Sequence, residues 1–200
     1  RTDVPMPDPN HRILMDVALA NTDRLVRIIN DILDISKIEA GKLELNPRPY
    51  DVHELVNLSI QSVGQIARGS SVALTPIVPP DIPKVNADPD RTIQAIVNLL
   101  SNALKCAPAR SEVTLEVRSD PPGFVTVAIA DRGRGIPAEK LSQLFQKFQQ
   151  IDGADTRKLR GTGLGLAITK ALVEMQGGSV GVTSEMGQGS TFWITIPVVK

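Results

Sequence analysis

Aromatic residues are scarce in this chain of 200 residues: phenylalanine, tryptophan and tyrosine together make up only 3% of it. The formal net charge is zero, so neither a base-stacking surface nor a basic excess suggests nucleic acid as a partner. A single cysteine, Cys106, excludes an internal disulfide and fits a reducing compartment. No apolar run approaches the roughly 20 residues that span a bilayer, so we expect a cytoplasmic chain that does not itself contact a membrane.

The sequence also lacks a signal peptide, and its start at Arg1 indicates a fragment of a longer protein, whose own attachment to a membrane the sequence does not reveal. Hydrophobic residues (42%) and charged residues (22%) occur in the proportions of an ordinary globular protein. We therefore expect one well-formed core with an additional element attached to it.

The additional element is a long helix, predicted to begin at Asp8-Pro9 and to end at Gly41. Apolar or small residues recur along it in alternating steps of four and three, with one polar member: Leu14, Ala18, Asn21, Leu25, Ile28, Ile32 and Ile35. Such a heptad seam is typical of a coiled coil, and Val17, Ile29 and Leu33 widen it. The pattern predicts a partner helix, and the alternative is a helix that lies on its own domain.

The remainder, residues 42–200, alternates between strand and helix patterns and predicts a compact mixed α/β domain. The expected strands are 42–45, 72–78, 85–88, 112–118, 124–130, 179–184 and 191–198. The expected helices are 51–68, 89–107, 137–149 and 164–175, with Asp51 and Asp88 as caps of the first two.

A glycine-rich stretch, Arg160-Gly161-Thr162-Gly163-Leu164-Gly165-Leu166-Ala167-Ile168, stands directly before the last of these helices. Glycine lets backbone approach a ligand closely, and the helix start offers unpaired N–H groups to an anion. The stretch therefore predicts a phosphate cradle, although ordinary turns use the same residues. A Walker loop is disfavoured because Lys-Ser/Thr does not follow, and a dinucleotide fold because no strand directly precedes.

Two further motifs carry polar chemistry. Asn98, Asn102 and Lys105 share one face of the helix 89–107, where amide oxygens suit a hydrated Mg²⁺ and the lysine suits a phosphate. The alternative is a polar outer face. Asp131-Arg132-Gly133-Arg134-Gly135-Ile136-Pro137 ends a strand with a carboxylate that can accept a hydrogen bond from an exocyclic amine, or else forms a simple turn.

The order of these motifs resembles the ATP-binding domain of sensor histidine kinases, in the superfamily with the Bergerat (GHKL) ATP site. The matching segments are 98–105, Asp131-x-Gly-x-Gly-Ile-Pro, Leu144-Phe145-x-x-Phe148, Gly161-Thr-Gly-Leu-Gly-Leu and Gly187-x-Gly-Ser-Thr-Phe192. The resemblance covers residues 42–198. Residues 25–41 also resemble the end of the second helix of the family's dimerisation and phosphotransfer hairpin, so that 1–41 is expected to be part of that hairpin.

The resemblance implies an α+β fold, a two-layer α/β sandwich in which helices cover a mixed sheet, preceded by the coiled-coil-like helix. ATP would lie between the helices and a lid at 151–162. Asp131 would bind the adenine amino group, and Asn102 would ligate Mg²⁺, with Asn98 close by and Lys105 on the phosphates. The residues expected around the nucleotide are Gly133, Gly135, Ile136, Gly161, Thr162, Gly163, Leu164, Gly165, Leu166 and Thr191. At least one of Phe145 and Phe148 is expected to be core.

Two departures from the family pattern stand out. Cys106 replaces an aromatic residue after the lysine, and we expect a buried, inert thiol rather than a reactive one. No phospho-acceptor is recognisable, because His11 and His53 lie outside the family's acceptor position and are expected to be surface residues.

We therefore expect a catalytic fragment that binds ATP and Mg²⁺ and transfers the γ-phosphoryl to a histidine of the parent kinase that is absent from this chain. The fragment should not autophosphorylate. Its expected partners are that acceptor helix, a response-regulator receiver domain and a second copy through the N-terminal helix. One alternative is a degenerate regulatory module without kinase activity. An ATP-hydrolysing machine of the same superfamily is disfavoured, because Asn98 stands where those proteins have a base glutamate.

Overall fold

Helix α1 (Pro9–Glu39) forms nearly all of the described part of the first of two units, Arg1–Lys42 and Leu43–Lys200. The computed structural model describes residues 9–149 and 162–199, and the two units are described separately. Gly41 ends the helix with φ +63°, and the Lys42 N–H donates to the Lys37 carbonyl at 2.8 Å. The predicted helix and its glycine stop are therefore confirmed.

Large apolar side chains are exposed along α1. They include Leu14, Val17, Leu25, Ile29, Ile32 and Leu33, whereas Ile28 is half-buried and Ile35 is buried. Met15, Leu19 and Val26, which lie outside the heptad stripe read from the sequence, are exposed as well, so the exposed apolar surface of α1 is wider than that stripe. Among the described residues, none of the helices combines the length and the apolar character that crossing a bilayer requires.

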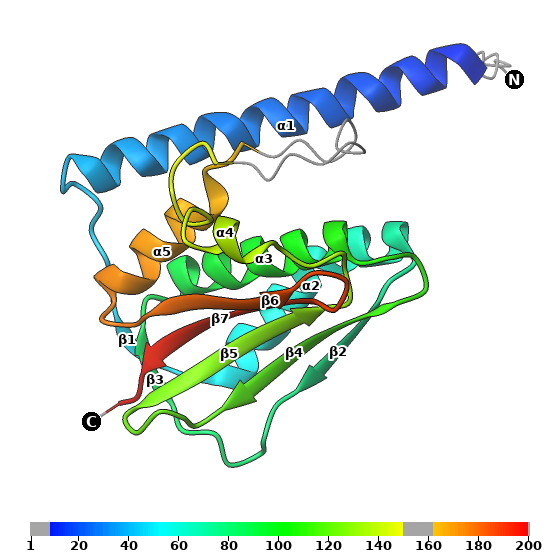
Figure 1. Ribbon diagram of the computed structural model, residues 1–200. Coiled ribbons are helices and arrows are strands. Elements are labelled where there is room, and N and C mark those ends of the chain that lie inside the picture. Colours follow the sequence, from blue (N-terminus) through cyan, green and yellow to red (C-terminus); the bar gives the residue numbers. More distant parts are fainter. Residues whose placement is uncertain (1–8, 150–161, 200) are drawn as a thin grey trace, which may run out of the picture. The chain divides into compact units, whose positions relative to one another are not determined.

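A five-stranded sheet forms one layer of the second unit, and helices form the other. The strand order is β2 (Ala73–Ile77), β4 (Glu112–Arg118), β5 (Phe124–Asp131), β7 (Gly189–Pro197) and β6 (Val180–Glu185). Only β2 and β4 run parallel, so the sheet is mixed. Helices α2 (Val52–Ser70), α3 (Pro89–Cys106) and α5 (Gly165–Met175) cover one face (Figure 1). This confirms the two-layer α/β sandwich.

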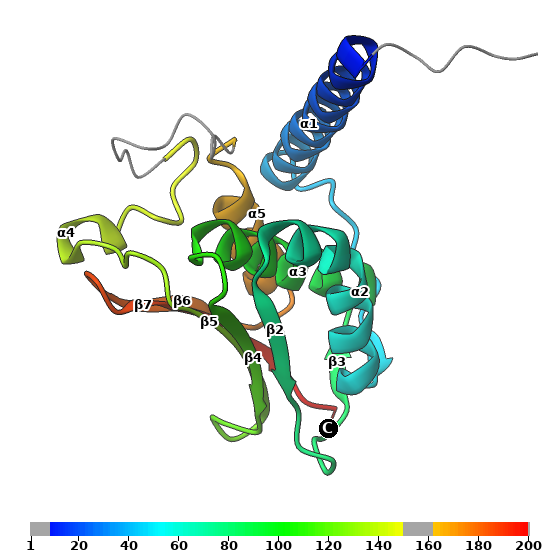
Figure 2. The same cartoon turned by 90° about the vertical axis from the view of Figure 1, so that its right-hand side faces the viewer.

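The core lies between this sheet face and the helices. Alternate residues of β5, Val125, Val127 and Ile129, are fully buried, as are Leu99 and Leu100 of α3. The period-two pattern of the strand thus selects the side chains that face the helices. Viewed from the side, the helices stand on one side of the sheet, and the other side carries no helix of the described residues (Figure 2).

Two sequence expectations on secondary structure were wrong. Residues 42–45 form no strand. Instead β1 (Arg48–Tyr50) pairs antiparallel with β3 (Val85–Ala87), and Pro49 is tolerated in β1 because this sheet has only two strands. The helix expected at 137–149 is only α4 (Ala138–Leu141), which continues in single turns such as Gln146 N–H to Gln143 O at 3.0 Å.

Candidate functional site

The structure brings three of the predicted motifs to one region of the second unit. Helix α3, which carries Asn98, Asn102 and Lys105, packs against both β5 and α5. Asp131 is the last residue of β5, and the glycine-rich stretch leads into the first residue of α5, Gly165. Residues separated by more than 60 positions in the sequence thus meet around the α3 helix.

Asp131 is a buried carboxylate, with only 6% of its surface exposed. The backbone N–H of Gly133 donates to its Oδ1 at 2.8 Å. Burial raises the pKa of Asp131, while hydrogen bonds from the backbone N–H groups of Gly133 and Ser190 oppose the rise. A carboxylate with few partners at the end of a strand can still accept a hydrogen bond from a ligand.

The two glycines after Asp131 are required by the protein's own backbone. A Cβ on Gly133 would lie 2.6 Å from Asp131 Oδ1 and 2.8 Å from the Cys106 carbonyl oxygen. Gly135 has φ +72°, and a Cβ there would lie 2.9 Å from the Cα of Met186. The glycines therefore let the loop after β5 lie directly against the end of α3 and the turn between β6 and β7.

Backbone hydrogen bonds fix this loop onto the β6–β7 hairpin. The Gly187 N–H donates to the Arg134 carbonyl at 2.8 Å, and the Ile136 N–H donates to Ser184 Oγ at 2.9 Å. Ile136 itself is half-buried against the core. The loop is thus one wall of the region, and its shape depends on the C-terminal hairpin.

The register of β5 and β7 distinguishes Ser190 from Thr191. Asp131 pairs with Ser190, whereas Thr191 pairs with Ala130 and so lies on the face of the sheet away from the helices. Ser190 is buried, and its Oγ lies 2.9 Å from Ser184 Oγ. The structure therefore places Ser190, which the motif reading missed, beside Asp131. Counting alternate residues back from Phe192, the apolar residue of the same motif, could have found it.

The two asparagines of α3 lie in different surroundings. Asn98 Nδ2 donates to Thr169 Oγ1 of α5 at 2.9 Å, so its side chain faces that helix. Asn102, one turn later, is half-buried. Lys105 is exposed near the end of the helix.

The polar side chains on this face of α3 fit a magnesium ion that is held mainly by water and by the phosphates of a bound nucleotide. Within residues 9–149 and 162–199 no cluster of three or more histidine, cysteine or acidic side chains could hold a metal. Mg²⁺ needs no such cage, because it keeps several waters and shares phosphate oxygens. A single amide oxygen would therefore suffice as the protein's ligand, and Asn102 is the residue predicted to supply it.

The described part of the glycine-rich stretch forms a tight turn into α5. Gly163 has φ +72°, and the Leu164 N–H donates to Thr162 Oγ1 at 3.1 Å. Leu164 is buried and Leu166 is half-buried against the core, so the apolar contacts of these two side chains hold the turn in place. Gly161 and most of the predicted lid, residues 151–162, lie outside the described residues.

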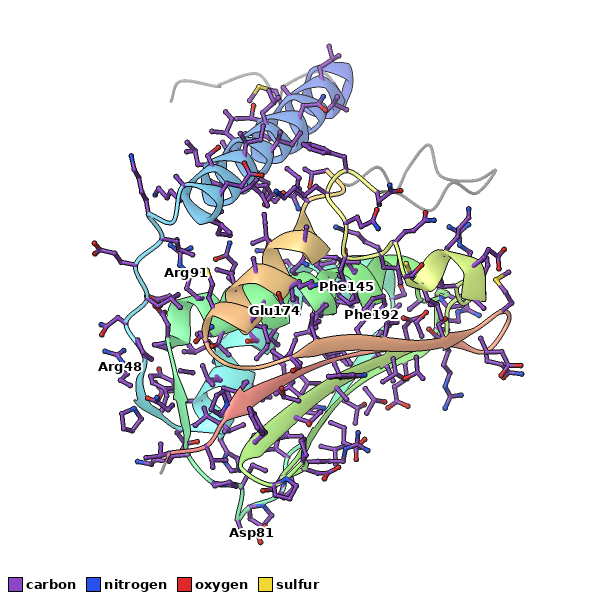
Figure 3. The ribbon with its side chains drawn as sticks, turned by 60° about the vertical axis from the view of Figure 1, so that its left-hand side comes forward. Arg48, Asp81, Arg91, Phe145, Glu174 and Phe192 are labelled. Carbon is purple, nitrogen blue, oxygen red and sulfur yellow. The ribbon has the colours of Figure 1, made fainter. Side chains whose placement is uncertain are left out.

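The two phenylalanines before the lid have separate roles. Phe145 packs against the core, as expected, and Figure 3 shows it with Phe192 on the side of the sheet that the helices cover. Phe148 is 71% exposed and has a positive φ of 62°. Its N–H donates to the Gly163 carbonyl at 2.9 Å, so the segment after α4 is tied to the glycine turn.

Cys106 corrects a prediction, because its side chain is exposed rather than buried. Two effects raise the pKa of the Cys106 thiol: the larger is partial desolvation, and the smaller is the negative charge of the neighbouring Asp131 carboxylate. The expectation of an unreactive thiol stays a prediction. His53 is half-buried next to Asp51, and the His11 side chain lies outside the described part of the chain.

Comparison with known families gives one broad match. The family described as histidine kinase-, DNA gyrase B- and HSP90-like ATPase matches residues 87–200. That span includes α3, the loop after Asp131 and the glycine turn before α5.

Several curated proteins are similar in sequence. The circadian input-output histidine kinase CikA of Synechococcus elongatus is 41% identical over 177 residues, which are 88% of this chain and 23% of that protein. The sensor histidine kinase RcsC of Escherichia coli is 39% identical over 175 residues, 87% of this chain and 18% of that protein. The chain therefore spans about a fifth of the length of these relatives.

Solved structures of histidine kinases are also similar to this chain. Full-length ShkA in complex with AMPPNP has a TM-score of 0.81 and 28% identity, covering 98% of this chain and 41% of that one. The mycobacterial sensor histidine kinase MprB has a TM-score of 0.65 and 29% identity, covering 76% of this chain and 98% of that one.

Proposed function

Because the chain belongs to the family of histidine kinase-, DNA gyrase B- and HSP90-like ATPases, we propose that residues 42–200 are the ATP-binding catalytic domain of a sensor histidine kinase. The observation that carries the proposal is the meeting of the buried Asp131 carboxylate, the Asn102 face of α3 and the glycine turn before α5. The similar proteins named histidine kinases support it and do not favour a module without kinase activity.

In this proposal the adenine ring lies against the loop after β5. The Asp131 carboxylate accepts a hydrogen bond from the exocyclic amine of adenine, and Gly133, Gly135 and Ile136 form the wall beside the ring. Ser190 takes the place that the motif reading gave to Thr191, since Ser190 is the residue paired with Asp131. The desolvated surroundings of the carboxylate strengthen that hydrogen bond.

The triphosphate runs toward the start of α5. The glycines at 161, 163 and 165, with Thr162, Leu164 and Leu166 between them, shape the turn that the phosphates follow, and the helix start offers N–H groups. Asn102 holds Mg²⁺ and Lys105 neutralises phosphate charge from the exposed end of α3. Bound there, the ion would neutralise charge that develops on the phosphate oxygens.

The transfer step asks this chain mainly for positioning and charge neutralisation. The nucleophile is the Nε2 of a histidine outside the chain, which attacks the γ-phosphorus while the bond to the β–γ bridging oxygen breaks and ADP leaves. Asn98 is an amide and cannot accept a proton, so it does not activate water as a glutamate would. The phosphoryl group then passes to an aspartate of a receiver domain.

The first unit supplies the assembly contact in this proposal. Residues 1–41 belong to the dimerisation and phosphotransfer hairpin, and the exposed stripe of α1, centred on Leu25, Ile29 and Ile32, packs against helices of the parent kinase, including a second copy. Sedimentation of the chain over a hundredfold concentration range tests this. A monomer mass throughout would contradict self-association of this fragment.

A calorimetric titration tests the nucleotide site. We expect the native chain to bind Mg²⁺-ATP, Asp131→Asn to lose at least tenfold in affinity, and Asp81→Asn, an exposed turn residue, to bind normally. Phosphate transfer from labelled ATP to a separately added acceptor hairpin, absent without that hairpin, tests the kinase assignment. No binding by the native chain would refute the proposal.

A further inference from the structure

The contact between Asn98 of α3 and Thr169 of α5 is one of the few polar contacts between these helices. The Asn98 amide donates to Thr169 Oγ1 at 2.9 Å, and Thr169 is only 1% exposed. A hydroxyl in the interior needs a partner, and the amide supplies it. The pair is therefore a satisfied polar contact between the two helices, separate from the one that Thr92 makes with Gln176 at the end of α5.

The same asparagine also touches the first residue of α5. A Cβ on Gly165 would lie 3.0 Å from Asn98 Cγ and even closer to its Oδ1, so a side chain at this position would displace the Asn98 amide. Gly165 and Thr169 are four residues apart and share one face of α5. Asn98 thus contacts α5 at two consecutive turns, the first of which leads directly out of the glycine turn at 163.

The position of Asn98 on α3 gives this contact its significance. Asn102 follows Asn98 by four residues and so lies one turn along the same face. The Asn98–Thr169 bond therefore sets how the proposed metal ligand stands relative to the start of α5. A shift of α5 along α3 would move the glycine turn and Asn102 apart, although neither would itself have changed.

We propose that Thr169 is a positioning residue for the phosphate end of the nucleotide site. Its hydroxyl holds the Asn98 amide, and Asn98 in turn holds the first turn of α5 and the glycine turn before it at a fixed place beside Asn102. This inference rests on the proposed function. It also gives Asn98 a structural role: its side chain links α3 to α5 and does not itself contact the nucleotide.

The test compares Thr169→Val, which replaces the hydroxyl with a methyl group, and Thr169→Ser, which keeps the hydroxyl. We expect Thr169→Val to weaken ATP binding about three- to tenfold and to leave adenosine binding unchanged, because adenosine lacks the phosphates. Thr169→Ser should bind ATP as the native chain does. Ser59→Ala is the matched control, since Ser59 is also a fully buried hydroxyl, bonded to Leu55 O at 2.7 Å in α2.

Equal loss of ATP and adenosine binding in Thr169→Val, or no loss at all, would overturn the inference while leaving the nucleotide site intact. Absence of ATP binding by the native chain would overturn the proposed function and the inference with it. Asn98→Ala keeps the test decisive if Thr169→Val does not fold. If both single variants fold, the double variant should bind ATP no more weakly than the single variant with the lower affinity, because both substitutions remove the same Asn98–Thr169 hydrogen bond.

Discussion

The backbone of Gly135 touches the backbone of Glu185 at a point where only glycine fits: a Cβ on Gly135 would lie 2.6 Å from the Glu185 carbonyl carbon. Gly189 repeats the arrangement in the opposite direction, since its Cβ would lie 2.9 Å from the Asp131 carbonyl carbon. The loop after β5 and the turn of the β6–β7 hairpin are thus packed backbone against backbone on both sides of Asp131.

We expect Gly135→Ala to reduce the free energy of unfolding by more than about 3 kcal/mol, because it combines a positive φ with a backbone collision. Gly123→Ala is the control, since Gly123 has φ +83° with no atom within 4 Å and should cost only about 1 kcal/mol. Urea unfolding of both variants measures the difference. Equal losses would mean that the contact with Glu185 carries no weight.

The buried Asp131 carboxylate predicts a pH dependence of stability. Its pKa is raised above the ordinary 3.8, so the folded chain binds this proton more tightly than the unfolded chain. The contribution of this proton to the free energy of unfolding is fully present below the unfolded-state pKa of 3.8, and it is lost as the pH rises through the pKa of Asp131 in the folded chain. Asp131→Asn removes it, so the stability of the native chain relative to this variant should fall between pH 4 and pH 7. Unfolding curves at both pH values check this, and a constant difference would contradict it.

Asn102→Ala tests the proposed magnesium ligand. In the native chain we expect Mg²⁺ to strengthen ATP binding, and in the variant we expect most of that gain, roughly tenfold in affinity, to disappear. Titrations with ATP in the presence of Mg²⁺ and of a chelator measure it. Asn57→Ala, an exposed asparagine of α2, is the control. An unchanged response to Mg²⁺ in Asn102→Ala would assign the ion to other groups.

Of the two side-chain helix caps that the structure describes, Asp88 and Asp51, we expect Asp88 to contribute more to stability. Its carboxylate accepts from the Arg91 N–H at 3.2 Å and from the Asn46 N–H at 2.9 Å, and it is buried. Asp88→Ala should cost about 2–4 kcal/mol, because a cap is lost and a backbone N–H is left without its partner. Asp51→Ala, which removes an exposed cap that accepts from the His53 N–H, should cost about 1 kcal/mol. Similar losses in thermal or urea unfolding would contradict the prediction.

The sequence predicted correctly those parts of the fold in which a local sequence pattern is compatible with only one kind of secondary structure. Helices α1, α2, α3 and α5 have strong 3.6-residue patterns with caps or glycine stops, and each was placed within a few residues. The strand at 42–45 was wrong because alternation alone does not supply a pairing partner. The helix at 137–149 was too long because residues spaced by three fit successive tight turns as well as a helix.

The motifs of the candidate site could be read from the sequence, whereas most of their contacts could not. Asn102, Asp131 and the glycines were singled out by residue type and spacing, and the structure packs the elements that carry them against one another, while their roles toward a nucleotide stay a prediction. That Ser190 rather than Thr191 faces the Asp131 side depends on strand register, and the Asn98–Thr169 bond spans 71 residues. Such relationships arise from how elements pack, which no short window of sequence contains.

The interlocked wall around Asp131 has a consequence for the order in which this protein is made. Residues 131–135 leave the ribosome well before the β6–β7 hairpin that packs against them, and β7 is the strand that pairs with β5. Helices α2 and α3 and strands β4 and β5 can therefore associate while nucleotide still has nowhere to bind. We expect a chain released after residue 176 to bind no ATP, so that in the cell nucleotide binding waits for the synthesis of this hairpin.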